Sequence, residues 1–174
     1  MKKIAFLDRD GTISKEYPDE DWKYVNTPEL LNNTIKGLKG INDLGYELII
    51  LTNQNLIADG IITYEQYEDY NNKLIDILKE NEIDILKTYY CPHNDLDNCN
   101  CKKPKTGMID KSLEDFDIDL SNSLYIGDSY SDYELAKKFN LKFYGIKGKN
   151  NDKIFKYQDL FDVVLDLEKE WFKC

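Results

Sequence analysis

"FLDRDGT", residues 6–12, ends an apolar run with two acidic side chains and a glycine. The run starts at Ile4 and has the length of a short buried strand, whereas Asp8 and Asp10 carry charges that repel each other. Two carboxylates held close together raise each other's pKa unless a cation stabilises the charged form. The stretch therefore predicts a strand that delivers a pair of acids to a site able to hold a cation.

Short apolar runs alternate with helical patterns along the rest of the chain. This alternation predicts an α/β fold of the three-layer α/β/α Rossmann-like kind, with helices on both faces of a parallel sheet. The length suits one domain over residues 1–174, without room for a large cap domain. Strands are expected at 4–7, 46–52, 85–90, 123–128, 141–146 and near 163–165, helices at 30–44, 63–79, 108–116, 132–139 and at the end, and a loop at 147–153.

Polar side chains follow four of the apolar runs. In such a sheet the ligand site lies beyond the carboxyl ends of the strands, so these side chains are expected to meet there. An isolated acidic motif is more often a solvated turn, but several polar endings on one edge are hard to assign to turns. Asp8 and Asp128 are the natural pair for Mg²⁺, which prefers oxygen ligands. The polar endings are Asp8 and Asp10, then Thr52, Asn53 and Gln54, then Cys91 and His93, and finally Asp128.

Three of the four cysteines cluster around the only histidine of the chain. Cys91, His93, Cys99 and Cys101 offer three thiolates and one imidazole, the closed tetrahedral set of a structural zinc site. A lone histidine is usually no ligand, but three flanking cysteines in a loop favour that role here. We therefore predict a zinc loop over residues 91–101 that supports folding and positioning, not catalysis.

The balance of charge argues against a nucleic acid or an anionic membrane as the main partner. The formal net charge is −10, whereas a nucleic-acid backbone or an anionic membrane requires a positive surface. No apolar stretch approaches the roughly 20 residues that cross a bilayer, and the run behind Lys2 and Lys3 is too short for a signal peptide. We expect a cytoplasmic, monomeric protein whose partner is a small molecule.

Four motifs, in this order, resemble those of the haloacid dehalogenase-like phosphatases. The resemblance implies that Asp8 is the nucleophile and forms an aspartyl-phosphate, and that Asp10 protonates the leaving alcohol and then activates water. It also implies that Asp8, the backbone carbonyl of Asp10 and Asp128 hold Mg²⁺, while Asp132 orients a metal-bound water or a lysine. The motifs are Asp8-x-Asp10-Gly11-Thr12, Thr52-Asn53, Lys103, and Gly127-Asp128 with Asp132.

The same resemblance implies how the phosphate is bound. The Thr52 hydroxyl and the Lys103 ammonium would donate to the phosphoryl oxygens, where charge develops in the transition state. Asn53 and Gln54 would lie nearby, with Asn53 holding the phosphate or the nucleophile. Lys102 would contribute a second cation beside the zinc loop. For Lys103 alone, an ordinary surface lysine is the competing interpretation.

Cys-Pro-His and Cys-x-Cys before residues 102–108, "KKPKTGM", are similar to the subgroup of D-glycero-D-manno-heptose 1,7-bisphosphate 7-phosphatases and histidinol phosphatases. This similarity implies a Mg²⁺-dependent phosphatase acting on a small sugar phosphate, most readily the heptose bisphosphate. Histidinol phosphate is the second candidate substrate, and a nucleic-acid 3′-phosphate is the third.

Two departures from that subgroup leave the substrate open. Lys102 stands where these enzymes usually have an arginine, so a single ammonium replaces a guanidinium with several hydrogen-bond donors. Asp59 stands where they usually have another arginine. A different class of function, a zinc-stabilised scaffold that binds phosphometabolites without turnover, would require a missing nucleophile, acid or lysine. None of these is missing.

Overall fold

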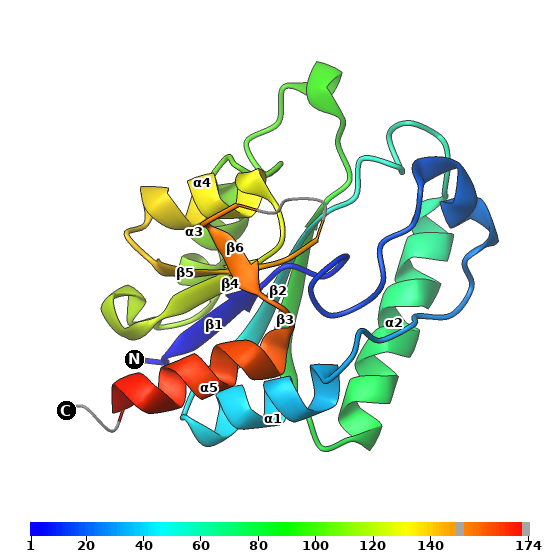
Figure 1. Ribbon diagram of the computed structural model, residues 1–174. Helices are drawn as coiled ribbons and strands as arrows, with labels where there is room; N and C mark the ends of the chain where they lie inside the picture. Colours follow the sequence, from blue (N-terminus) through cyan, green and yellow to red (C-terminus); the bar gives the residue numbers. More distant parts are fainter. Residues whose placement is uncertain (149–151, 172–174) are drawn as a thin grey trace.

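The computed structural model describes residues 1–148 and 152–171 (Figure 1). Its strands form one six-stranded parallel sheet in the order β3-β2-β1-β4-β5-β6. The predicted three-layer parallel fold is confirmed, as are the strands expected over its first 146 residues. The strands are β1 (Ile4–Leu7), β2 (Glu47–Asn53), β3 (Ile85–Cys91), β4 (Leu124–Gly127), β5 (Lys142–Ile146) and β6 (Phe155–Tyr157).

Helices cover both faces of the sheet, and the alternation of side chains along β1 shows why. Ala5 and Leu7 point into the core shared with α1, α2 and α5, whereas Ile4 and Phe6 point into the core shared with α3 and α4. Figure 1 shows α1 and α5 side by side on one face, and α3 and α4 on the other. The helices are α1 (Thr34–Asp43), α2 (Tyr64–Glu80), α3 (Gly107–Asp115), α4 (Tyr130–Lys138) and α5 (Leu160–Trp171).

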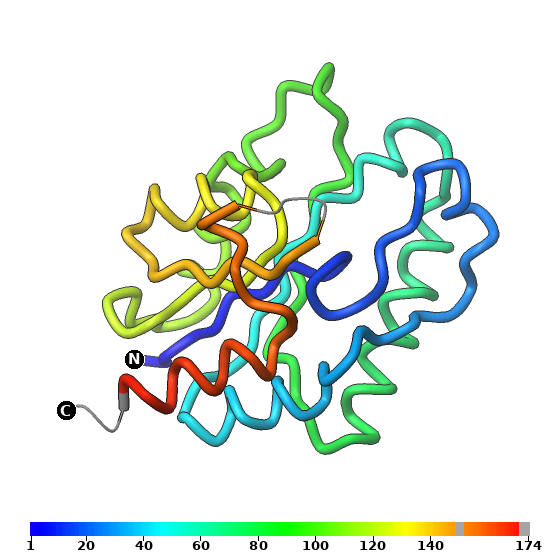
Figure 2. The backbone as a smooth tube through the Cα atoms, in the orientation of Figure 1, coloured from blue at the N-terminus to red at the C-terminus, as the bar shows by residue number. Residues whose placement is uncertain are grey.

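The strand order reverses between β1 and β4. The chain runs outward from β1 through β2 to β3, and then returns to place β4 on the other side of β1. A crevice beyond the carboxyl ends of two such strands is the usual ligand site of an open parallel sheet. Figure 2 shows the segments that follow β1, β2 and β3 gathered at this end of the molecule.

The strand expected near 163–165 is wrong, because those residues lie inside α5. Three consecutive β-branched or aliphatic residues suit a strand, but the buried positions Leu160, Val163, Val164 and Leu167 follow the helical spacing i, i+3, i+4, i+7. The last strand comes earlier, as β6. Three residues between turns are too short for alternation to reveal a strand.

Two smaller differences concern segment ends. The helix expected over 30–44 begins later, at Thr34, because Leu30 forms an isolated β-bridge with Ser14. Part of the loop expected over 147–153 lies outside the described residues. Within those residues, we find no helix with the length and apolar character that crossing a membrane demands.

Candidate active site

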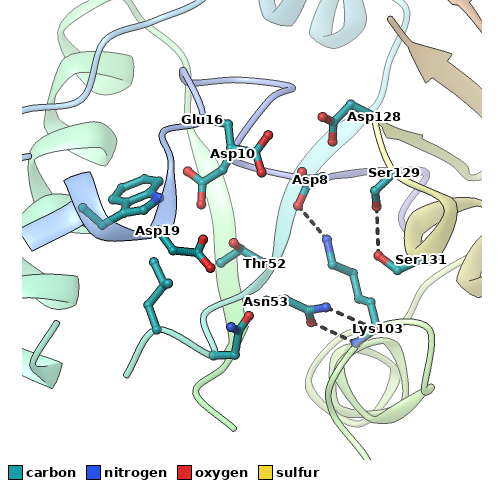
Figure 3. A pocket seen from close by; sticks show the side chains of 13 residues that line it. Asp8, Asp10, Glu16, Asp19, Thr52, Asn53, Lys103, Asp128, Ser129 and Ser131 are labelled. Atoms are coloured by element: carbon teal, nitrogen blue, oxygen red, sulfur yellow. Dashed lines mark hydrogen bonds and ion pairs between the residues drawn. The ribbon is translucent and has the colours of Figure 1, made fainter. Parts of the chain in front are cut away.

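A cavity of about 300 Å³ lies at the carboxyl ends of the central strands (Figure 3). Six predicted site residues line it: Asp8, Asp10, Thr52, Asn53, Lys103 and Asp128. The rest of the wall was not selected from the sequence. Most of it comes from loops and from the 3₁₀ turn η1 (Asp19–Tyr24), which carry no motif, whereas Ser129 caps α4 and Ser131 lies in its first turn, between Asp128 and Asp132. These additional residues are Glu16, Asp19, Trp22, Asn55, Leu56, Ser129 and Ser131.

The ammonium of Lys103 joins two of the acids. Its Nζ donates to Asp8 Oδ1 at 2.6 Å, to Asp132 Oδ1 at 2.7 Å and to the carbonyl of Leu51 at 2.8 Å. All three bonds are buried, so the Lys103 side chain is fixed beside the predicted nucleophile. Charge-assisted hydrogen bonds of this kind are stronger than neutral ones.

Asp132 is held in place by the start of α4. Ser129 caps this helix in a capping box, in which Asp132 N donates to Ser129 Oγ at 3.3 Å and Ser129 N donates to Asp132 Oδ2 at 3.2 Å. The Tyr125 hydroxyl donates to Asp132 Oδ1 at 2.9 Å. The oxygens of Asp132 are thus bonded to Lys103, Ser129 and Tyr125. That Asp132 orients the lysine or a metal-bound water stays a prediction.

The acids around the cavity fit a divalent cation. Carboxylate oxygens of Asp8, Asp128 and Asp132 lie within 4.8 Å of one another. Burial raises the pKa of the Asp8 carboxyl well above its usual value; Lys103 opposes the rise, while Asp132 and Asp128 add to it. Burial, Asp132 and Glu16 raise the pKa of Asp128 to about 7. A cation would remove this penalty on the charged forms, so the donor set suits Mg²⁺.

The carboxylate of Asp10 faces a different set of partners. Arg9 donates to both of its oxygens at 2.9 Å, Gln54 Nε2 donates to Oδ2 at 2.9 Å, and Ser14 Oγ donates to Oδ1 at 3.3 Å. Arg9 was not selected from the sequence, although its place between the two motif aspartates was a signal. Gln54 also donates to Thr52 Oγ1 at 3.0 Å and does not itself line the cavity.

Asn53 ties the end of β2 to the loop that carries Lys103. Asn53 Oδ1 accepts from the Lys103 backbone N–H at 2.8 Å, and Asn53 Nδ2 donates to the Lys103 carbonyl at 3.2 Å. Two hydrogen bonds to one residue fix both the position and the direction of its backbone. Asn53 therefore acts on the lysine, and its predicted contact with phosphate stays a prediction.

The two departures from the subgroup lie away from the cavity wall. Lys102 Nζ donates to Asp95 Oδ1 at 2.8 Å, and Asp59 accepts from Asn55 and Asn94, each at 3.0 Å. Neither Lys102 nor Asp59 lines the cavity. A contact of Lys102 with substrate stays a prediction.

The predicted zinc ligands come together at the end of β3. Cys91 Sγ lies 3.5 Å from Cys99 Sγ, 3.0 Å from Cys101 Sγ and 3.6 Å from His93 Nδ1. His93 Nδ1 and Cys101 Sγ are 3.3 Å apart. Four atoms with these separations can surround a zinc ion at bond lengths of about 2.0–2.3 Å. The set fits the predicted closed zinc site, which leaves no position for substrate.

Comparison with known proteins identifies the family. The sequence model described as "Polynucleotide kinase 3 phosphatase" matches residues 3–145. A relative from Thermoplasma volcanium, named "Probable D-glycero-D-manno-heptose-1,7-bisphosphate 7-phosphatase", is 39% identical over 145 residues, covering 81% of this chain and 96% of the relative. "Histidine biosynthesis bifunctional protein HisB" from Campylobacter jejuni is 33% identical over 144 residues, covering 81% of this chain and 40% of that protein.

The fold has close counterparts among solved structures. The crystal structure of D,D-heptose 1,7-bisphosphate phosphatase from B. bronchiseptica, complexed with magnesium and phosphate, has a TM-score of 0.82 at 22% identity and covers 98% of this chain and 99% of that one. The match of the family model to most of the chain is decisive for membership. The chain therefore belongs to the polynucleotide kinase 3 phosphatase family, within the haloacid dehalogenase-like phosphatases whose motifs it carries.

Proposed function

We propose that this protein is a magnesium-dependent phosphatase that removes the 7-phosphate of D-glycero-D-manno-heptose 1,7-bisphosphate or a closely related sugar phosphate. The observation that carries the proposal is the convergence of Asp8, Thr52, Lys103 and Asp128 on one cavity at the switch point of the sheet. The name of the Thermoplasma relative, which aligns over nearly its whole length, supports the heptose substrate.

Asp8 performs the first chemical step. A carboxylate oxygen attacks the phosphorus while the bond from phosphorus to the alcohol oxygen breaks, so the phosphoryl group is transferred to Asp8. Lys103 and Thr52 donate to the phosphoryl oxygens, over which negative charge is spread in the transition state. When bound, Mg²⁺ neutralises part of this charge and is held by Asp8, Asp128 and the backbone carbonyl of Asp10.

Asp10 moves the protons. In its acid form it gives a proton to the departing alcohol oxygen. In the second step the resulting carboxylate takes a proton from water, whose oxygen attacks the phosphorus and displaces the Asp8 carboxylate. The products are the free alcohol and inorganic phosphate, and Asp8 is regenerated. The place of Asp10 on the cavity wall supports this role.

The zinc site supports this chemistry through the loop. We propose that Cys91, His93, Cys99 and Cys101 bind a structural zinc ion, which fixes the backbone two residues before Lys103. Misplacing a catalytic charge by about 1 Å costs on the order of a hundredfold in rate. The single domain over 1–174, the monomeric state and the cytoplasmic location remain predictions.

A second candidate substrate is histidinol phosphate, because of the charge on the cavity wall. Among the described residues, Lys103 is the one basic side chain lining the cavity, whereas the acids lining it include Glu16 and Asp19. These carboxylates disfavour a second phosphate and favour an amino alcohol, which is positively charged. A nucleic-acid 3′-phosphate is disfavoured by the net charge of −10.

A panel of substrates tests the proposal. Phosphate release is measured with Mg²⁺ for the heptose bisphosphate, the heptose monophosphate and histidinol phosphate. We expect the bisphosphate to have the highest kcat/KM; a higher value for histidinol phosphate would transfer the assignment to the second candidate. Asp8→Asn is expected to lose more than about a thousandfold in rate with unchanged melting temperature. Equal release by Asp8→Asn and wild type would rule out the phosphatase and favour the scaffold.

A further inference from the structure

Arg9 is the only arginine of the sequence, in which the other basic side chains are lysines. It is also among the most deeply buried large residues, with 1% of its surface exposed. A charged side chain is almost never buried so completely unless it is paired. The mechanism above gives Arg9 no role, so both its identity and its burial require an explanation.

The partner of Arg9 is Asp10. Arg9 Nε donates to Asp10 Oδ1 and Arg9 Nη2 donates to Asp10 Oδ2, both at 2.9 Å. This is the parallel two-bond geometry that only a guanidinium offers, because an ammonium provides a single point of charge. The position therefore calls for arginine on geometric grounds.

Three aromatic rings lie close to the guanidinium. Its Cζ lies 4.8 Å from the ring centre of Tyr70, 5.4 Å from that of Tyr67 and 5.9 Å from that of Trp22. Each distance is within the range of a cation–π contact. Tyr67 and Tyr70 do not line the cavity, whereas Trp22 does, as does the Asp10 carboxylate with 14% of its side chain exposed.

We propose that Arg9 is a positioning residue for Asp10: the guanidinium, fixed by the rings of Tyr67, Tyr70 and Trp22, holds the carboxyl at the distance from which it reaches the leaving oxygen. Arg9 itself touches no substrate, since it does not line the cavity. The inference rests on the proposed function, because it assigns Arg9 to the proton-transfer step of that reaction.

The test compares two leaving groups. An alkyl phosphate, glycerol 1-phosphate, needs a proton on its departing oxygen, whereas 4-nitrophenyl phosphate releases a stable anion and does not. The measured quantity is kcat/KM, which covers the steps up to departure of the alcohol and so excludes the later attack of water. We expect Arg9→Lys to lose about a hundredfold with the alkyl ester and less than about threefold with the aryl ester.

A second variant and a control separate positioning from folding. Tyr70→Leu keeps Arg9 but removes one of the rings beside it. We expect its kcat/KM to fall about tenfold more with the alkyl ester than with the aryl ester. This variant decides the question if Arg9→Lys does not fold. Leu38→Ala removes a buried side chain of α1 that does not line the cavity, so it lowers the melting temperature without changing the ratio of the two kcat/KM values.

The outcomes are distinct. A selective loss with the alkyl ester in either variant supports the role of Arg9. Equal losses with both esters, or no loss with either, overturn it while leaving the phosphatase in place. Failure of the wild-type protein to hydrolyse these esters and every phosphate of the substrate panel overturns the proposed function and this inference together.

Discussion

At the scale of single residues, the predicted cation site depends on a glycine. Gly11 has a φ of 90°, and a Cβ at this position would lie 2.2 Å from Asp128 Oδ2. A side chain would therefore displace the carboxylate proposed to bind Mg²⁺. We expect Gly11→Ala to raise the Mg²⁺ concentration for half-maximal phosphate release by at least about tenfold, because mutations that reorient a metal ligand have effects of this size.

Gly45→Ala is the matched control for this substitution. Gly45 has a similar φ of 82°, but a Cβ there meets nothing within 4 Å. Both variants lose about 1–2 kcal/mol of stability through left-handed backbone strain, and only Gly11→Ala changes the Mg²⁺ requirement. An unchanged Mg²⁺ requirement in Gly11→Ala would show that Asp128 does not bind the ion.

Residues at strand ends could be predicted from the sequence, whereas residues on the cavity wall could not. Asp8 and Asp128 each follow an apolar run, so the sheet topology alone brings them to one edge. Glu16 and Trp22 reach the same cavity from the segment between β1 and α1, whose path is set by tertiary packing. Arg9 was not predicted as a site residue because charged side chains are expected to face solvent, whereas this one is buried.

At the scale of elements, α1 and α5 pack through glycines. A Cβ at Gly37 would lie 2.4 Å from Leu160 Cβ and 2.8 Å from the Phe161 backbone nitrogen, whereas one at Gly40 would meet the methyl groups of Val164, the nearest at 2.7 Å. Backbone atoms cannot move aside without shifting the whole helix. We expect Gly37→Ala to cost about 2 kcal/mol in urea unfolding, despite its better helix propensity.

Gly40→Ala, one turn along the same helix, is the natural comparison. Removing the Val164 methyls in a Gly40→Ala, Val164→Ala double variant relieves its clash, so the two substitutions are expected to couple favourably. No side-chain truncation relieves Gly37→Ala, because its nearest neighbour is already a Cβ. Equal stability of Gly37→Ala and wild type would mean that the helices separate more easily than this packing implies.

The packing of α1 against α5 also shows what limited the prediction of strands and helices from the sequence. Strands such as β1 are bounded by charged residues and fully buried, so their apolar runs are unmistakable. The final segment has a run of three apolar residues that fits a strand or a helix equally well. Its packing against Gly37 and Gly40 of α1 favours the helix, and this information lies more than a hundred residues away in the sequence.

At the scale of the whole molecule, the two proposed metals act in different ways. The proposed Mg²⁺ ligands follow strands of a sheet whose core is formed by apolar side chains, so removing Mg²⁺ should leave the fold intact. The proposed zinc ligands instead lie in the loop from Cys91 to Cys101, which leads to Lys103 and its bonds to Asn53. Loss of zinc should therefore disturb both stability and the position of the lysine.

These differences predict two distinct results. Chelation of Mg²⁺ is expected to stop phosphate release at once, with full recovery on its return and with the protein still folded. Cys99→Ser is expected to lower the zinc content and the melting temperature and to reduce the rate at saturating Mg²⁺ by about tenfold to a hundredfold, because Asp8 and Asp128 remain in place while Lys103 is held less firmly. Zinc content is measured by elemental analysis and stability by calorimetry. Full zinc occupancy and full stability in Cys99→Ser would contradict the proposed ligand set. Normal turnover in a zinc-free protein would show that the zinc loop is not needed to position Lys103.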